Sequence, residues 1–292
     1  MLIRRIMTAF GRKPAPTVSV LRLSGVIGAG GAFRPGITLA ALAPAIQRAF
    51  SVPGQQAVAL QVNSPGGSPV QSALVAGRIR QLADEKKVPV FAFAEDVAAS
   101  GGYWLACAAD EIYADPSSII GSIGVVSAGF GFQDLIARYG IERRVHTSGT
   151  RKAMLDPFQP ERDEDIVRLK AIQGEIHDAF KAMVRGRRGD RLKGTDEDLF
   201  SGEFWTGAKA LDLGLVDGLG DLRSVMRDRF GEKVNLRLVH GERRWWRSRI
   251  RTEAALSGLT PSGLTPSGLA DDLAGALVNA VEDRAMWSRF GL

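Results

Sequence analysis

The chain has 292 residues, of which 45% are hydrophobic and 24% charged, and it carries a formal net charge of +6 at pH 7. This composition is that of an ordinary globular protein, long enough to bury a substantial core in one large or two modest domains. Its one cysteine, Cys107, excludes an internal disulfide framework and a multi-cysteine metal site.

Strands and helices alternate in the first third of the chain. Apolar runs rich in β-branched residues predict strands at 17–23, 57–63 and 88–94, and helical spacing fills 37–50 and 68–87 between them. This alternation is typical of an α/β fold with a mostly parallel sheet covered by helices.

The rest of the chain is less regular. The predicted elements are a short strand at 111–115, a helix at 133–140, a strand at 141–148, a long helix from about 160 to 185 with an acidic start, a helical segment at 206–220 and a late strand at 234–240. A glycine-rich stretch, GSIGVVSAGFG, occupies 121–131.

We divide the chain into a basic amphipathic tail (1–15), a main domain (16–240) and a basic tail (241–292). The second tail contains the repeat SGLTPSGLTPSGL, which cannot build a core, and ends in a segment with helical spacing. No secretory signal or membrane-spanning segment is predicted near the start. The apolar side chains between Leu2 and Phe10 lie on one helical face, however, so a short interfacial helix is an alternative.

Positive charge gathers in the stretches 1–13, 185–193 and 242–251. Nucleic acid, an acidic surface or anionic lipid could each explain such clusters, and solvated faces are the simplest explanation. Because no helix-turn-helix, zinc or RNA-binding signature accompanies the charge, we predict no nucleic-acid partner.

The stretch VAASGGYWLACAAD, residues 97–110, places Ser100 directly before two glycines and an apolar helix. A helix N-terminus presents free N–H groups, which stabilise the anion formed when a hydroxyl attacks a carbonyl. Gly101 and Gly102 would let a substrate approach the backbone, with the N–H of Gly101 pointing at the oxyanion. The simpler alternative is that Ser100 only caps the helix.

A second loop, QVNSPGGSP, follows the strand at 57–63 and precedes a helix. Its glycines, Gly66 and Gly67, would then lie at the carboxyl end of a parallel strand, where ligands bind in open α/β sheets. The loop lacks the spacing and the lysine of a phosphate-binding loop. It fits the second wall of an oxyanion hole beside a bound substrate, although a simple turn is an alternative.

A serine nucleophile needs a base, and none of the three histidines, His146, His177 and His240, lies in a context that suggests a catalytic triad. The stretch SGTRKAMLDPF, 148–158, offers Lys152 instead, flanked by apolar residues that would bury its amine and favour the neutral form. A surface lysine is the plainer alternative.

Four motifs in this order, VNSPGG, ASGGYWLA, GSIGV and SGTRKAMLDPF, resemble the serine/lysine signal peptide peptidase family (SppA/SohB-like), over about residues 17–225. The resemblance implies that Ser100 is the nucleophile, Lys152 the general base and Ser122 the residue that orients the lysine. It also implies that Gly67 and Gly101 form the oxyanion hole, and Gly66 and Gly102 are the neighbouring candidates for contact with the substrate.

The same resemblance implies a ClpP/crotonase-like fold of repeated ββα units with a helical oligomerisation region. Members assemble into rings or domes in which a neighbouring protomer supplies the lysine. The implied reaction is peptide cleavage through an acyl-enzyme, without metal or cofactor, on remnant signal peptides or other hydrophobic or unfolded polypeptides. A bacterial source follows from the family. The missing N-terminal anchor favours a cytoplasmic location, with peripheral contact to the inner membrane as the alternative.

Two other functions remain open. An acyl-CoA enzyme of the crotonase type would share the fold but needs a catalytic carboxylate, for which Glu95 and Asp96 are the nearby candidates. A catalytically idle scaffold that binds peptides or membranes through its basic segments is the second.

Overall fold

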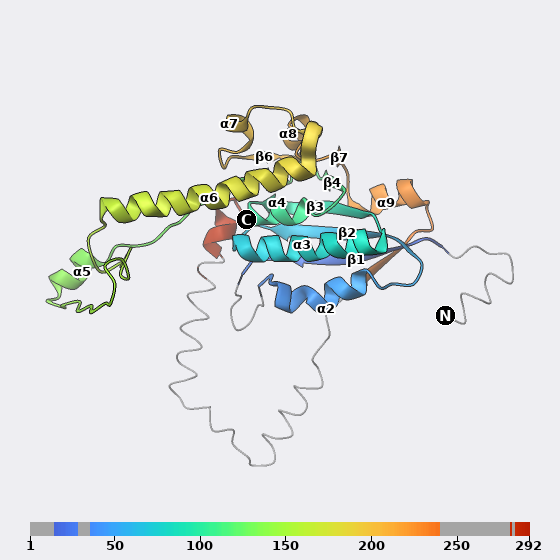
Figure 1. Ribbon diagram of the computed structural model, residues 1–292. Helices are drawn as coiled ribbons and strands as arrows, with labels where there is room; N and C mark the ends of the chain where they lie inside the picture. The colour runs from blue at the N-terminus through green and yellow to red at the C-terminus, as the bar shows by residue number, and fades with distance from the viewer. Residues whose placement is uncertain (1–14, 29–35, 240–280, 282–283) are drawn as a thin grey trace, which may run out of the picture.

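The computed structural model describes residues 15–28, 36–239, 281 and 284–292 (Figure 1). The tail predictions for 1–15 and 241–292 therefore lie almost wholly outside the described residues, as do the interfacial helix and the Ser-Gly-Leu-Thr-Pro repeat. Of the helix expected near the end of the chain, residues 284–288 are described and helical. Next to them the Phe290 ring meets the Phe204 ring edge-on, with centroids 5.2 Å apart.

The described residues form an eight-stranded sheet in the order β6-β5-β3-β2-β1-β8, with β4 paired to β3 and β7 paired to β4. The pairs are parallel except for β5 with β6. The strands are β1 (Thr17–Ser24), β2 (Gln55–Ser64), β3 (Val90–Ala99), β4 (Glu111–Ala114), β5 (Ile119–Gly121), β6 (Phe204–Thr206), β7 (Gly218–Leu219) and β8 (Asn235–Val239).

Side chains on successive strand residues point to opposite faces, and both faces of the sheet are covered. One face packs against α2 (Leu39–Ala49), α3 (Pro69–Lys86) and α4 (Gly101–Ala106) in the larger hydrophobic cluster. The other carries Val18, Val20, Ala57, Ala59, Phe91 and Phe93, which pack against Met226 of α9 (Leu222–Phe230). The strands at the centre are therefore apolar on both sides, as expected for a parallel sheet.

Strand β3 changes its neighbour halfway along. Its residues 91–94 pair with β4, and its residues 97–99 pair with β5. Since Ala99 is paired with Gly121, the residues that follow these two strands, Ser100 and Ser122, leave the sheet side by side. This division of β3 brings two distant motifs to one edge.

The long helix α6 (Asp163–Arg188) is packed at one end only. Phe180 and Val184 in its carboxyl-terminal half are buried, while most of its first half is exposed. Figure 1 shows α5 (Gln133–Arg138) and the loops around it at the far end of α6, away from the sheet. We call residues 125–162 the arm. The elements after α6 are η1 (Gly189–Arg191), α7 (Asp196–Leu199) and α8 (Gly207–Asp212).

The predicted α/β class with a mostly parallel sheet is confirmed, and so are the first three strands, the two helices between them and the long acidic-started helix. The strand predicted at 141–148 is wrong: these residues form no strand and are largely exposed, with no paired neighbour among the described residues. The helix predicted at 206–220 is confirmed only for α8, because the chain then turns into β7.

Candidate active site

Ser100 lies at the sharp turn between β3 and α4. Its φ of 51° and ψ of −122° lie outside the regions that residues with a Cβ normally adopt. Such a conformation costs about 1–3 kcal/mol and persists only where its surroundings enforce it. Here the Ser100 N–H donates to Gly121 O at 2.7 Å, and Ser100 O accepts from Trp104 N at 3.1 Å.

The hydroxyl of Ser100 does not cap α4, although the residue occupies the cap position. Its side chain makes no capping hydrogen bond. The alternative that Ser100 is only a helix cap is therefore not supported. A strained strand-to-helix turn whose hydroxyl has no partner in the described part of the chain has the geometry of a nucleophile elbow.

The loop after β2 meets this turn through its two glycines. Gly66 and Gly67 have φ values of 106° and 139°. The loop is pinned to Ile27, whose N–H donates to Gly66 O at 2.8 Å and whose carbonyl accepts from Ser68 N at 2.7 Å. A Cβ on Gly67 would lie 2.0 Å from Ile27 O, so only glycine fits there. The structure thus shows more than a simple turn.

The two predicted oxyanion donors lie close together. A Cβ placed on Gly101 would be 3.4 Å from Gly67 N, and a Cβ on Gly66 would be 3.0 Å from Gly101 N and 2.8 Å from the Ser100 Cβ. Within the described part of the chain, neither the Gly67 N–H nor the Gly101 N–H donates to another group. Two free donors beside a free hydroxyl could stabilise a developing oxyanion.

Gly102 is explained by packing. It is buried in α4, and a Cβ there would lie 2.3 Å from Ser64 O at the end of β2. The lack of a side chain lets α4 approach the sheet, and contact of Gly102 with a substrate stays a prediction.

Ser122 is the second serine at this edge. It is only 6% exposed and has a φ of 52°, and its N–H donates to Glu203 O at 2.6 Å. The pairing of Ala99 with Gly121 places it next to the Ser100 turn. Two non-glycine residues with positive φ thus lie at adjacent strand ends, as expected of a functional site.

Lys152 lies apart from these residues. It belongs to the arm, its side chain is exposed in the single chain, and its N–H donates to Gly149 O at 3.3 Å. The arm is at one end of α6, whereas α4 packs on the other (Figure 1). The burial that we expected from its apolar neighbours is therefore absent within one chain, because the arm has too little structure around it to cover a side chain.

The residues after Ser100 support the turn from beneath. Tyr103 is fully buried and donates from its hydroxyl to Leu215 O at 2.7 Å, and the Trp104 ring stacks on Phe180 of α6 with centroids 4.7 Å apart. Burial raises the pKa of Tyr103 well above its usual value and the pKa of Cys107 to about 12. Both groups stay protonated at neutral pH, which fits a packing role for this helix.

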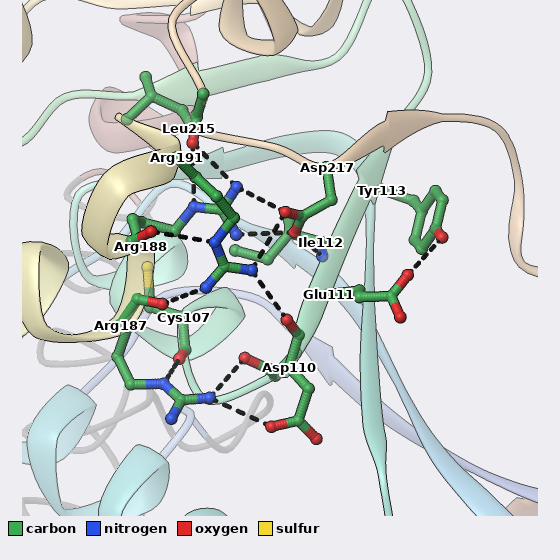
Figure 2. A network of polar contacts seen from close by, with 12 residues as sticks. Cys107, Asp110, Glu111, Ile112, Tyr113, Arg187, Arg188, Arg191, Leu215 and Asp217 are labelled. Atoms are coloured by element: carbon green, nitrogen blue, oxygen red, sulfur yellow. Dashed lines mark hydrogen bonds and ion pairs between the residues drawn. The ribbon is translucent and has the colours of Figure 1, made fainter. Parts of the chain in front are cut away.

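Arginines of α6 and η1 hold the far end of α4 (Figure 2). Arg187 donates to Cys107 O at 2.8 Å and to Ala109 O at 2.7 Å. The side chain of Arg188 is 2% exposed and pairs with both carboxylate oxygens of Asp217 at 2.7 and 3.0 Å. A cation at a helix carboxyl end also complements the helix dipole.

The two carboxylates considered as catalytic groups of an acyl-CoA enzyme, Glu95 and Asp96, both accept hydrogen bonds from side-chain amides. Glu95 accepts from Gln61 Nε2 at 2.5 Å, and Asp96 accepts from Asn63 Nδ2 at 2.7 Å. No group of His, Cys, Asp and Glu residues in the described ranges could hold a metal ion. None of the described helices is both long enough and apolar enough to cross a membrane.

Sequence reasoning missed the contributions of Ile27, Glu203 and His177. The first two act through backbone groups, which no side-chain motif reveals. His177, whose sequence context suggested no catalytic triad, lies with its Nε2 3.1 Å from the carbonyl oxygen of Ile123, the residue after Ser122. Its position in the middle of a long helix gave no sign of this contact.

Several known proteins are similar to this chain. A protein of Brucella abortus named Na(+)/H(+) antiporter NhaA is 49% identical over 292 residues, which are 100% of this chain and 39% of that protein. Chloroplastic serine protease SPPA of Arabidopsis thaliana is 33% identical over 171 residues, 57% of this chain and 24% of that protein. A solved structure of the 1510-N membrane-bound stomatin-specific protease gives a TM-score of 0.49 at 15% identity, covering 78% of this chain and 100% of that one.

The chain spans 39% of the length of the Brucella relatives. Residues 82–236, more than half of the chain, match the family model described as Peptidase family S49, and this range contains Ser100, Ser122 and Lys152. The mostly parallel sheet covered by helices is consistent with the α/β fold that the resemblance implied. The chain belongs to peptidase family S49.

Proposed function

We propose that the protein is a serine endopeptidase in which Ser100 and Lys152 form a catalytic dyad. The neutral amine of Lys152, oriented by Ser122, takes the proton of the Ser100 hydroxyl while its oxygen bonds to a peptide carbonyl carbon. The lysine then gives that proton to the leaving amine as the peptide bond breaks. A water molecule, deprotonated by the same lysine, hydrolyses the remaining ester and frees the serine.

The observation that carries this proposal is the turn at Ser100. In its strained backbone conformation the hydroxyl makes no hydrogen bond to another described residue, and beside it lie the N–H groups of Gly67 and Gly101, which likewise donate to none of them. One such donor typically changes kcat by about 10²–10³-fold, so a pair accounts for a large share of catalysis.

A neighbouring copy of the chain would supply Lys152. The arm that carries this lysine lies at the far end of α6, away from α4 (Figure 1), and several of its large apolar side chains are exposed. Its exposed large side chains are Val126, Phe130, Phe132, Leu135, Tyr139 and Ile141. Apolar surface of this extent is typical of an interface, so a ring or dome of identical chains would both cover the arm and complete each site.

The proposed substrates are peptides, such as remnant signal peptides or other hydrophobic or unfolded polypeptides, held between the glycine loop at 66–67 and α4. The proposed place of action is the cytoplasm, with peripheral contact to the inner membrane as an alternative. No metal or cofactor takes part in the proposed reaction.

The test compares wild type, Ser100→Ala, Lys152→Ala and a mixed assembly of the two variants on a fluorogenic peptide library and an unfolded protein. Lys170→Ala is the matched control, since Lys170 is an exposed lysine of α6 outside the motif. We expect Ser100→Ala and Lys152→Ala each to lose at least about 10³-fold in kcat. The control should keep the wild-type activity, and the mixed assembly should recover part of the wild-type activity.

Activity that survives either single substitution would refute the dyad. Loss in both without recovery in co-expressed mixed assemblies would place serine and lysine in the same chain and refute the shared site. Turnover of an acyl-CoA thioester by the Ser100→Ala protein would favour the crotonase-type alternative instead.

A further inference from the structure

His177 makes the only side-chain hydrogen bond to the segment 122–124 among the described residues. Its Nε2 lies 3.1 Å from Ile123 O, and the side chain is partly buried between α6 and that segment. A carbonyl can only accept, so His177 must carry a proton on Nε2 here. Ile123 O has no other donor among the described residues.

The segment that His177 contacts is held in a conformation that needs support. Ser122 has a φ of 52°, and its backbone is fixed on one side by the bond from its N–H to Glu203 O. On the other side, Gly124 N donates to Ser122 O at 3.0 Å, which closes a tight turn around Ile123. The Ile123 side chain is fully buried in the core, and its carbonyl gives the turn a further anchoring point through His177.

His177 marks the end of the anchored half of α6. Further along the same helix Phe180 stacks on Trp104 and Arg187 binds the carbonyls at the end of α4, whereas most of the preceding turns are exposed. The histidine therefore ties the Ser122 turn to the same rigid helix that supports the Ser100 turn. A small shift of α6 at this point would move Ser122 relative to Ser100.

We infer that His177 is a positioning residue: by donating to Ile123 O it holds the Ser122 turn so that the Ser122 hydroxyl meets the lysine. This inference rests on the proposed function. In this role His177 acts through the backbone of the turn, since its Nε2 contacts the Ile123 carbonyl oxygen.

The test uses His177→Gln, which keeps a donor at nearly the same distance from the backbone, and His177→Leu, which keeps the bulk and removes the donor. Glu175→Leu is the matched control, since Glu175 is exposed on the same helix and makes no polar contact with another described residue. Each protein is assayed for kcat and KM on a fluorogenic peptide. Hydrogen exchange is followed at the amides of Ser122 and Gly124, both of which are hydrogen-bonded in the turn.

We expect His177→Leu to lower kcat at least about tenfold with KM within about twofold, as for a misplaced catalytic group, and to speed exchange at both amides about tenfold or more. His177→Gln and Glu175→Leu should stay within about threefold of wild type in each measurement.

Wild-type kcat or unchanged exchange in His177→Leu would overturn the inference, and so would a His177→Gln protein as impaired as His177→Leu. If the wild type cleaves no peptide, the proposed function is wrong, and His177 then has no role in catalysis. The exchange rates in that case still decide whether His177 holds the turn, so the two failures can be told apart.

Discussion

Replacing Gly66 with alanine tests how closely the glycine loop and the Ser100 turn depend on each other. The new Cβ would lie 2.8 Å from the Ser100 Cβ and 3.0 Å from both Ala99 O and Gly101 N. Carbon atoms in good contact are about 3.5–4.0 Å apart, so the turn must move to accommodate the methyl group. The methyl group would also crowd Gly101 N, the second of the two proposed oxyanion donors.

Two contributions to the free energy of unfolding can be separated. Gly66 has a φ of 106°, and an alanine in that region costs about 1–3 kcal/mol. Overpacking against Ser100 adds about 1–3 kcal/mol. Gly25→Ala is the matched control, because Gly25 has a φ of 114° but a Cβ added there would have nothing within 4 Å, and it should carry the first cost alone.

The assay is denaturant unfolding of both variants together with kcat for peptide cleavage. We expect Gly66→Ala to be less stable than Gly25→Ala by about 1–3 kcal/mol. Among molecules that remain folded, Gly66→Ala should lose at least about 100-fold in kcat, the usual cost of one lost oxyanion donor, while Gly25→Ala stays near wild type. Equal stability of the two variants, or an active Gly66→Ala protein, would refute the contact between the two loops.

Three further predictions concern the support of α4. Asp217→Asn should lower the free energy of unfolding by about 3 kcal/mol at pH 7, because buried Arg188 loses its carboxylate. Burial opposes the charge on Asp217, but hydrogen bonds from Arg188 bring its pKa below 3.8. The stability that the charged carboxylate contributes to the wild type is present above this value and is lost as the pH falls through the native pKa. In unfolding curves, the difference in stability between Asp217→Asn and wild type should therefore shrink below about pH 4. Phe180→Ala should cost about 3–5 kcal/mol in the same assay, since the ring is buried and stacked. Cys107, with its pKa of about 12, should resist iodoacetamide at pH 8 until the protein unfolds, as mass spectrometry would show.

The central fold could be predicted from the sequence because its signals are local. The strands around Val58 and Val90 are apolar on both faces, and the loop after the first of them carries Gly66 and Gly67, whose φ values are positive. Strands β5, β6 and β7 have only two or three residues, too few for any periodicity, and they depend on pairing with distant segments. The predicted strand around Arg143 shows the converse, since a suitable pattern without a partner forms no strand.

The sequence predicted those residues of the candidate site whose reactive side chains stand beside glycines in a recognisable motif. Ser100 and Ser122 stand in motifs, and the parallel pairing of β3 with β5 brings them together. The position of Lys152 could not be predicted, because the arm is attached to the start of α6. Its place in the fold therefore depends on the direction of that long helix, which no local sequence pattern reveals. The contact of His177 was equally hidden, since it depends on which turn of α6 meets Ile123.

The helix α4 has six residues, too few to be stable by its own hydrogen bonds, yet it must hold the strain at Ser100. Its stability comes from its surroundings: every residue is buried, and Arg187 of α6 donates to the carbonyls of Cys107 and Ala109, which follow the helix. The neighbouring Arg188 is itself held by an ion pair with Asp217, which fixes this end of α6 in place. The same helix α6 carries the arm at its other end (Figure 1). In the proposed assembly, a partner chain bound to the arm would contact one end of the helix whose other end supports both serine turns, so binding of the partner could alter the geometry of the Ser100 turn.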